Sequence, residues 1–427
     1  MRALALLVLL LAQEPDVDAL LNQLEDESVE VREKAAAALI EVGPKAEAKL
    51  RARIASADGA LRTVCTRILE TIAVPKELRK VVPPLRRVTM DARPRKLKEV
   101  LDDLQGQSGL SLATEGLADG DVTVEMKDAT PLEALSILCK AAGLTFYLDG
   151  GGRHVRGIVP MGADDKPAIR ISRGQYPDVP RQFTRHYVVE PTNLSLTRST
   201  NFQSAQQSNA YLNMRILWNP GMEPEASRLE VASIEDDKGR SLLPKTRGQV
   251  EGGRVSEWNR SHGGWGRGGA DQNVALLYPE PDAKAIGSIK GTAVMKYVIA
   301  ETTVLFESPE KLVGEKKESG DLTLEIQEWT LDGDRLTVKL QLTGYKDSAD
   351  DRGLRTRLDS RHFRMKTEDG SVPQSQGWSG GGGGGTYSMS LNYVGVKSKV
   401  LSVEVVVDTK LAEDRFDFEL KEIPLPK

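Results

Sequence analysis

The residues best able to do chemistry are few and scattered along the chain of 427 residues. No histidine is spaced i, i+4 from another or lies in a Cys-x-x-Cys cluster, the spacings that metal sites use; the four are His154, His186, His262 and His362. The acidic clusters "DGD" and "EDD" fall at turn-like positions, where aspartate is ordinary. The sequence therefore predicts neither a metal site nor a cofactor.

The segment "GWSGG" at 377–381 formally matches a catalytic motif, the G-x-S-x-G nucleophile elbow. That elbow needs a strand before the serine and a helix after it. Here more glycines follow, and no histidine lies after His362, so the order serine, aspartate, histidine cannot be completed. The segment "GGWGRGG" also lacks the strand and helix of a nucleotide-binding fingerprint. We expect no catalytic residues.

Two glycine-rich segments each carry a tryptophan and run on to a tyrosine. Trp265 precedes Tyr278 by 13 residues, and Trp378 precedes Tyr393 by 15 residues. Since glycine runs form no packed structure of their own, one interpretation is a flexible loop at the end of each β-domain. The other is an adaptable loop with an aromatic anchor, because rigid scaffolds often carry function on loops. Under that interpretation, these four aromatic residues are candidate protein contacts.

The net charge and the first residues of the chain indicate the class of partner and the cellular compartment. The net charge of −4 gives no general attraction to nucleic acid. The first residues, "MRALALLVLLLAQEP", hold one positive charge and then an apolar run that is too short for the roughly 20 residues of a membrane span. We therefore predict a signal peptide at 1–13, with export to the periplasm or beyond, and no transmembrane span. A buried first helix of a cytosolic protein is the alternative.

Residues 16–74 repeat with a period of 30, and we predict a helical-repeat domain at 16–80. Each unit is a helix, a polar turn ("EDES", "SADG") and a second helix with an apolar stripe, and Gly43-Pro44 separates the units. The segment "VREKAAAALIEVGPKA" resembles a HEAT repeat, including the arginine near the start of the second helix. The resemblance implies a stack of helical hairpins that provides a binding surface. Two repeats are fewer than the roughly three that usually fold alone, so we expect this region to pack on something else.

A second module repeats within residues 87–158. The segments "VTMDARPRKLKEVLDDLQGQSGLSL" and "VTVEMKDATPLEALSILCKAAGLTFYL" both pass from a strand to an Asp-Ala-x-Pro turn, a helix and Gly-Leu. In the second copy, Thr130 and Glu133 form a capping box at the helix start, Pro131 takes the first helical position, and Gly143 ends the helix. This pattern resembles the short amino-terminal domain of secretins and TonB-dependent proteins. The resemblance implies a periplasmic domain that contacts other proteins and has no catalytic residues.

The second half of the chain has the alternation of β-strands. "YLNMRILW", "LTLEIQEW" and "LTVKLQL" alternate apolar and polar residues, and "EDDKGR" and "TEDGS" are hairpin turns. We predict two tandem, loosely immunoglobulin-like β-sandwiches at 166–307 and 308–427, each with a glycine-rich loop. The fold class is therefore multidomain α + α/β + all-β: a helical repeat, a small βαβ-βαβ domain and two tandem antiparallel β-sandwiches.

The two cysteines, Cys65 and Cys139, lie in different modules. We expect each to be a small buried hydrophobic residue, although an exported protein could pair them.

The leading functional hypothesis is a non-enzymatic, exported adaptor or scaffold of a bacterial cell envelope. Its expected partners are envelope proteins, with a secretion or pilus assembly as one candidate, and the sequence does not fix the oligomeric state. One alternative is an accessory subunit of a secretin-type machine. The other is a divergent hydrolase with a site across the β-sandwiches, for which His262 and His362 would be the residues to test.

Overall fold

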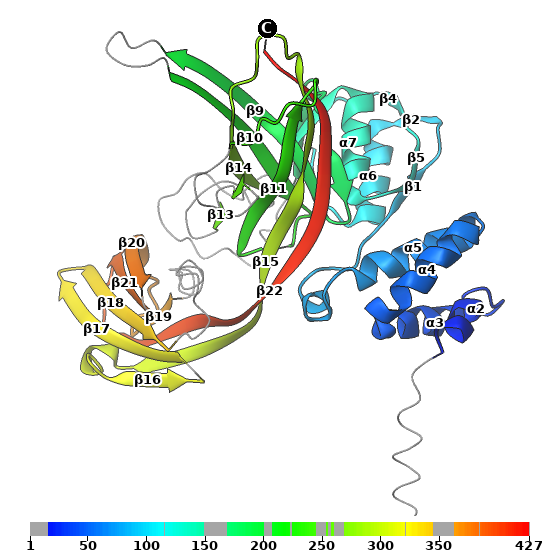
Figure 1. The fold of residues 1–427 in the computed structure, drawn as a ribbon. Coiled ribbons are helices and arrows are strands. Elements are labelled where there is room, and N and C mark those ends of the chain that lie inside the picture. Colours follow the sequence, from blue (N-terminus) through cyan, green and yellow to red (C-terminus); the bar gives the residue numbers. More distant parts are fainter. Residues whose placement is uncertain are drawn as a thin grey trace, which may run out of the picture. The chain divides into compact units, whose positions relative to one another are not determined.

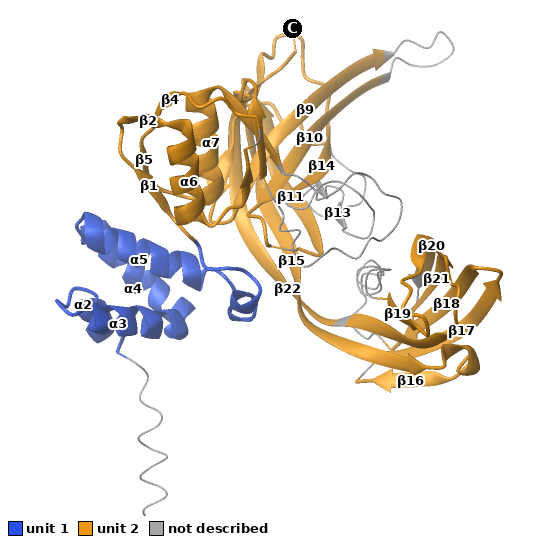
Figure 2. Cartoon of the chain, turned by 180° about the vertical axis from the view of Figure 1, so that it is seen from behind, with its two compact units in different colours: residues 1–85 blue, residues 86–427 orange. Residues whose placement is uncertain are grey.

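The computed structural model describes residues 16–114, 116–148, 169–199, 207–222, 224–244, 253–254, 258–259, 269–320, 322–344, 363–383 and 385–426. The predicted signal peptide at 1–13 lies outside the described residues. The chain divides into two compact units, residues 1–85 and 86–427, coloured separately in Figure 2. Helices dominate the first unit, whereas the second is rich in strands that form several sheets. Within the described part of the chain, no helix is both long and apolar enough to cross a membrane.

The described residues of the first unit, 16–85, form four α-helices in two hairpins, followed by a short 3₁₀ helix. The elements are α2 (Val17–Gln23), α3 (Val29–Val42), α4 (Pro44–Ser56), α5 (Gly59–Ile72) and η1 (Lys76–Lys80). Gly43 ends α3 with a φ of +69°, and Pro44 opens α4, as expected for a junction between hairpins. The core combines both hairpins: Leu21, Leu24, Ala35, Leu39, Ala46, Leu50, Cys65, Ile68 and Ile72.

The 30-residue period reappears in the hydrogen bonds of this unit. The Arg32 guanidinium donates to the carbonyl oxygen of Glu27 at 2.9 Å, and the Arg62 guanidinium donates to that of Ala57 at 3.0 Å. Each arginine therefore reaches back five residues and ties the start of its helix to the preceding turn. The two hairpins share a local design as well as an apolar pattern.

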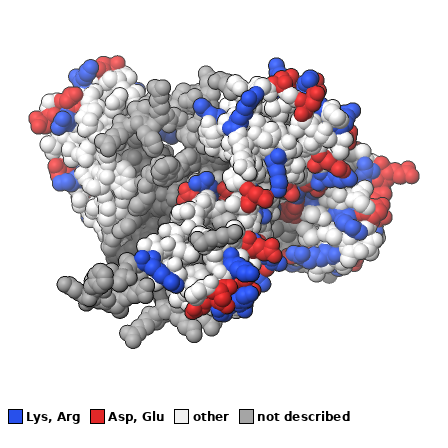
Figure 3. Space-filling model, turned by 90° about the horizontal axis from the view of Figure 1, so that it is seen from above, with Lys and Arg blue, Asp and Glu red and all other residues white. Residues whose placement is uncertain are grey.

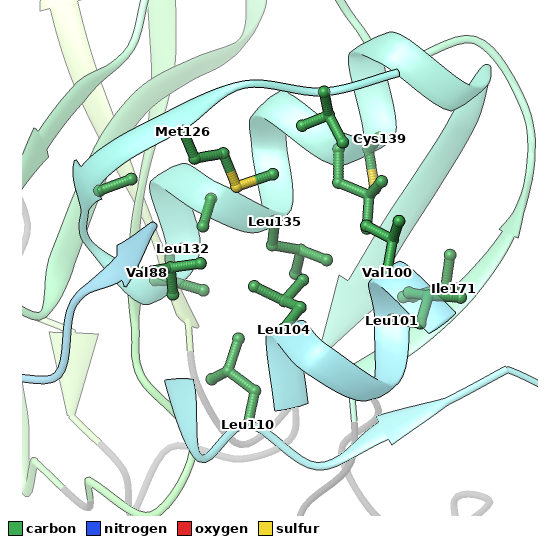
Figure 4. Packing of buried hydrophobic residues seen from close by; sticks show 14 of the residues in the cluster. Val88, Val100, Leu101, Leu104, Leu110, Met126, Leu132, Leu135, Cys139 and Ile171 are labelled. Carbon is green, nitrogen blue, oxygen red and sulfur yellow. The ribbon is translucent and has the colours of Figure 1, made fainter. Parts of the chain in front are cut away.

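The second unit begins with the repeated strand–helix module. The first copy holds β1 (Val88–Met90), β2 (Pro94–Lys96), α6 (Leu97–Ser108) and β3 (Leu112–Ala113). The second copy holds β4 (Asp121–Thr123), β5 (Met126–Ala129), α7 (Pro131–Ala142) and β6 (Leu144–Leu148). Strand β1 pairs with β5, and β2 pairs with β4. Side chains of α6 and α7 point toward one another in the module's core, among them Leu104 and Leu135 (Figure 4).

The capping signals of the second copy act as predicted. The Glu133 carboxylate accepts a hydrogen bond from the backbone N–H of Thr130 at 3.1 Å, so the capping box is present, and Gly143 ends α7 with a φ of +64°. The first copy differs, because Pro94 lies in β2 and the helix begins only at Leu97. Pro94 heads a short strand, a position where its missing N–H costs little.

The module also extends past its predicted end at residue 158. Strand β7 (Ile169–Arg173) pairs in parallel with β3 and antiparallel with β6, so it completes a three-stranded sheet with the order β3-β7-β6. Ile169 and Ile171 of β7 are buried in the module's core. The predicted first sandwich, which was to begin at residue 166, therefore wrongly includes β7, because this strand belongs to the module.

Three larger sheets account for most of the other described strands of the unit (Figure 1). The four-stranded sheet, of order β14-β10-β9-β8, contains β8 (Gln182–Thr184), β9 (Tyr187–Ser199), β10 (Gln207–Trp218) and β14 (Gly269–Leu276). The six-stranded sheet contains β11 (Ala226–Asp236), β12 (Gly253–Arg254), β13 (Trp258–Asn259), β15 (Ala285–Glu307), β19 (Phe363–Thr367) and β22 (Val400–Pro424). The five-stranded sheet contains β16 (Lys316–Ser319), β17 (Leu322–Asp332), β18 (Arg335–Thr343), β20 (Gln374–Gly383) and β21 (Thr386–Val394).

Two long strands connect these layers. Strands β15 and β22 pair from Ala285↔Pro424 to Glu307↔Ser402, and the register shifts near Ala300. Side chains from β9, β15 and β22 meet between the four- and six-stranded sheets. The opposite ends of β15 and β22 join β19 in a core shared with the five-stranded sheet, which includes Phe306 and Val403. After the five-stranded sheet is complete, β22 thus returns to pair with β15 beside the four-stranded sheet. The predicted boundary at 307/308 therefore does not divide the strands into two consecutive domains.

Candidate functional site

The structure places the four predicted contact residues in different surroundings. Trp265 lies outside the described residues. Tyr278 is half-buried just after β14, and the Arg198 guanidinium lies 4.2 Å from its ring centroid. Trp378 is half-buried in β20, against the core that the five-stranded sheet covers. Tyr393 is only 4 % exposed and stacks on Phe363, which leaves it little surface to offer a partner.

The second glycine-rich segment forms a strand instead of the predicted loop. Residues 374–383 make up β20, which pairs with β21 at the edge of the five-stranded sheet. A Cβ atom on Gly380 would lie 2.5 Å from the Tyr387 hydroxyl oxygen and 3.0 Å from the Ser388 carbonyl oxygen. Glycine is needed there because a neighbouring tyrosine occupies the space above the strand, so packing explains this part of the glycine run.

The cysteines and the described histidine provide no reactive centre. Cys65 and Cys139 are free and fully buried, as expected for small core residues. Burial raises the pKa of the Cys139 thiol to about 12, which disfavours the reactive thiolate. His154, His262 and His362 lie outside the described residues. Among the described residues, no group of three or more histidine, cysteine, aspartate or glutamate side chains could hold a metal ion.

The best-formed candidate site is a pocket beside strand β6, which we call the β6 pocket. Its volume is about 430 Å³, within the range of roughly 300–1,000 Å³ usual for small-molecule sites. The module and the four-stranded sheet both line it: Thr145, Phe146, Tyr147, Tyr176, Pro177, Arg181, Glu190, Arg215, Leu217, Gly269 and Asp271. The module's core also includes Val188 and Leu217 of that sheet, so packing fixes the pocket's two walls against each other.

Aromatic rings form one wall of the β6 pocket. Phe146 and Tyr176 stack with ring centroids 5.8 Å apart, and the Arg181 guanidinium lies 4.3 Å from the Tyr176 centroid. The Tyr176 hydroxyl lies 2.7 Å from the Ser136 oxygen and donates to it, which fixes the ring to α7. Burial is the main reason that the pKa of Tyr176 is raised, so this hydroxyl stays neutral. Tyr147 remains 49 % exposed.

A row of charged side chains forms the facing wall. In the sheet, Arg215 of β10 is the register partner of both Glu190 on β9 and Asp271 on β14, so the three side chains share one face. Arg215 donates through Nε to Asp271 Oδ1 at 2.8 Å and through Nη2 to Oδ2 at 3.2 Å. Arg181 Nε donates to Glu190 Oε2 at 2.6 Å, and both of these side chains are nearly buried. Two arginines therefore balance two carboxylates.

A larger hollow, about 760 Å³, lies over β15 and β22, and we call it the ribbon hollow. Lys290, Asp417, Glu419 and Lys421 line it, and the Lys290–Glu419 pair is 3.5 Å apart with both side chains substantially exposed. Exposed ion pairs of this kind are weak and easily rearranged. The ribbon hollow is therefore larger but less pre-organised than the β6 pocket.

Charges of both signs are also mixed on the face of the molecule that Figure 3 presents. On that face, basic and acidic side chains lie beside one another instead of forming a region of one sign (Figure 3). This distribution agrees with the near-neutral net charge of the chain.

A second polar cluster lies in the interior between the four- and six-stranded sheets. Asp414 of β22 is fully buried and accepts hydrogen bonds from Arg185 Nη2 at 2.7 Å and from the Tyr187 hydroxyl at 2.8 Å. The Tyr187 and Tyr297 hydroxyl oxygens lie 2.9 Å apart, and the Tyr187 ring stacks on Phe416. Burial raises the pKa of both tyrosines, so both stay protonated. Because every contact is internal, this cluster has the character of a structural clamp.

The neighbouring His186 is buried and neutral. Burial, followed by the charges of Arg185 and Arg87, lowers the pKa of His186 to about 4. The Asn219 side-chain nitrogen lies 3.1 Å from Nδ1 and can only donate, so Nδ1 accepts and the ring proton lies on Nε2. A histidine held neutral in this way cannot act as a cation at neutral pH.

Sequence reasoning missed the β6 pocket entirely. Arg215 and Asp271 are 56 positions apart, and they meet only because β10 and β14 are neighbours in the sheet. One local signal was available: Arg215 interrupts the otherwise apolar run "MRILW". An arginine inside such a strand usually has a partner, but nothing in the sequence identifies it.

Comparison with known proteins adds no further constraint, since no protein-family model, characterised protein or solved structure matches this chain.

Proposed function

We propose that the protein is a non-enzymatic, exported adaptor or scaffold of a bacterial cell envelope. It binds other proteins through its HEAT-like helical unit and its module resembling the short amino-terminal domain of secretins, and its β-sandwiches provide the body that carries them. This proposal joins the predicted export signal with two modules whose resemblances both imply protein contacts.

The observation that carries the proposal is the pair of helical hairpins. They repeat an arginine-to-carbonyl contact at a period of 30, and within the described residues they share a core of nine buried side chains. Stacks of helical hairpins usually provide binding surfaces instead of active sites. Short stacks usually need a neighbouring domain or partner for stability. Val29, at the start of α3, is 58 % exposed and offers an apolar contact for such a neighbour.

Site-specific photo-crosslinking in the native envelope tests this proposal. A photoreactive residue at Val29, in the otherwise intact chain, should link to one recurring envelope protein identified by mass spectrometry. The matched control is Leu331 on β17, which is also apolar and is 51 % exposed. Links from both positions to the same mixture of abundant proteins, or no intermolecular link from Val29, would count against an adaptor.

The same experiment addresses the secretin-machine alternative. Recurring links to a secretin or a pilus component would identify the machine, whereas links to another envelope protein would leave the adaptor without that assignment. A hydrolase would be indicated instead if the purified chain showed an activity that substitution of His262 or His362 abolished.

A further inference from the structure

We propose that the β6 pocket binds an uncharged saccharide. The inference goes beyond protein binding and does not rest on the proposed adaptor function. It rests on the pocket's charge balance, on the geometry of its polar groups and on its exposed aromatic surface.

The charge balance defines the class of ligand. Arg181 is paired with Glu190, and Arg215 is paired with Asp271. To form an ion pair in this pocket, an anionic ligand would have to displace a carboxylate from its arginine. A cationic ligand would have to displace an arginine from its carboxylate. Breaking the nearly buried Arg181–Glu190 pair would leave an uncompensated charge, which is costly. The ligand that fits without such disruption carries no net charge.

The polar wall is suited to hydroxyl groups. The Arg215–Asp271 pair is held side-on by two hydrogen bonds, yet the two side chains keep 41 % and 45 % of their surfaces exposed. The guanidinium retains a donor, Nη1, and the carboxylate retains free lone pairs. Neighbouring hydroxyls of a sugar ring can accept from the first and donate to the second. The paired side chains fix this donor and acceptor before the ligand arrives, which reduces the entropy lost on binding.

The aromatic wall is suited to the other side of the same ligand. Sugar rings present apolar C–H groups on their faces and hydroxyls at their edges. Tyr147, which is half-exposed, and Phe146 supply rigid apolar area at a low cost in side-chain entropy. A peptide strand would instead use main-chain hydrogen bonds, whereas the wall that faces these rings is a row of side chains on a sheet face.

Isothermal titration calorimetry of the full chain with neutral tetrasaccharides tests the proposal. The probes are chitotetraose, cellotetraose and maltotetraose; the anionic tetramer of galacturonic acid and a neutral extended heptapeptide serve as comparisons. We expect at least one neutral tetrasaccharide to bind at a single site. Tyr147→Ala and Asp271→Asn should each weaken it at least tenfold, and Glu419→Gln, in the ribbon hollow, should leave it unchanged.

Both test positions are about half-exposed, so these variants should fold, and near-ultraviolet circular dichroism checks that they do. The absence of binding by all three neutral probes would overturn the proposal. So would binding that both pocket variants retain, or binding confined to the anionic tetramer or to the peptide. Because none of these results depends on envelope partners, the saccharide site can fail while the adaptor stands, and the reverse.

Discussion

At the scale of single residues, the interior of the second unit depends on polar groups whose partners are far away in the sequence. Arg185 adopts a φ of +42°, which is unusual for a residue with a side chain, and it directs its guanidinium at the buried Asp414 carboxylate. Such a pair is costly to desolvate, and removing one partner is costlier still. Substitution of either residue should therefore destabilise the fold strongly.

The first prediction concerns Asp414. Asp414→Asn should lower the free energy of unfolding by about 3 kcal/mol, because the Arg185 charge would remain buried without a carboxylate. Urea denaturation measures the change. Asp417→Asn is the matched control, since Asp417 lies on the same strand, is exposed and should change stability by less than about 1 kcal/mol. Equal effects of the two substitutions would contradict the clamp.

The second prediction is a pH dependence that arises from His186. Its pKa is about 4 in the folded chain and 6.5 when unperturbed, so between these values the unfolded state binds more protons. Stability should therefore fall as the pH is lowered through this window, by about 2 kcal/mol between pH 7.5 and pH 5. The contribution is fully present above pH 6.5 and lost toward pH 4.

Urea titrations at pH 7.5 and pH 5 measure this effect. His186→Gln removes the titrating group, so it should reduce the pH-dependent loss even if it alters stability at both values. Carboxylates titrate mostly below this range, which keeps the comparison specific. An unchanged difference between the two pH values in the variant would show that His186 is not the cause.

At the scale of elements, local signals predicted most helices and strands, and packing decided the exceptions. The capping box at Thr130 and the glycine stop at Gly143 operate within a few residues, so the sequence shows them directly. The edge strand β20 could not be predicted in this way. Its glycines have low strand propensity, and only the side chain of Tyr387 on β21 explains one of them.

The candidate site was unpredictable for a related reason. Glu190 and Asp271 flank Arg215 from two different strands, and only the sheet register makes them neighbours. The aromatic wall adds residues from β6 and from the segment after β7. The spacing of these residues along the chain does not reveal that they are neighbours, because their contact depends on the pairing of distant strands.

The third prediction separates two adjacent glycines of β20. Gly380→Ala should destabilise the protein by about 1–3 kcal/mol, because the added methyl group would overlap the Tyr387 hydroxyl. Gly381→Ala meets nothing within 4 Å and should stabilise by up to about 1 kcal/mol, since it restricts the unfolded chain. Thermal denaturation of both variants measures the difference. Similar effects at the two positions would argue against the packing of Tyr387 over the strand.

At the scale of the whole second unit, the strands form two layered bodies, one around the four- and six-stranded sheets and one around the five-stranded sheet. The two bodies do not follow one another along the chain. The segment between β15 and β22 forms the body around the five-stranded sheet, and β22 then returns to pair with the beginning of β15. The body around the five-stranded sheet is thus inserted into the other one. Tandem domains and an inserted domain have similar strand patterns, so strand periodicity could not distinguish them.

The final prediction tests this insertion with two altered chains. The first replaces residues 301–409 with an Asn-Gly turn, so that the Ala300↔Lys410 pair closes a short hairpin. The second simply ends at residue 307. The first should fold, because it keeps Asp414, Phe416 and the paired length of β22 beside β15. The second should not, because Arg185 and one edge of β15 lose their partners.

Near-ultraviolet circular dichroism and cooperative urea unfolding provide the readout, because Tyr187 and Tyr297 lie beside Asp414 and are immobilised only when the cluster forms. The excised chain loses the buried contacts around Phe306 but retains the interior between the four- and six-stranded sheets. If the chain ending at residue 307 folded cooperatively, the final strand would be dispensable to the first body. The two bodies would then be tandem domains joined by a ribbon, as the strand pattern alone predicts.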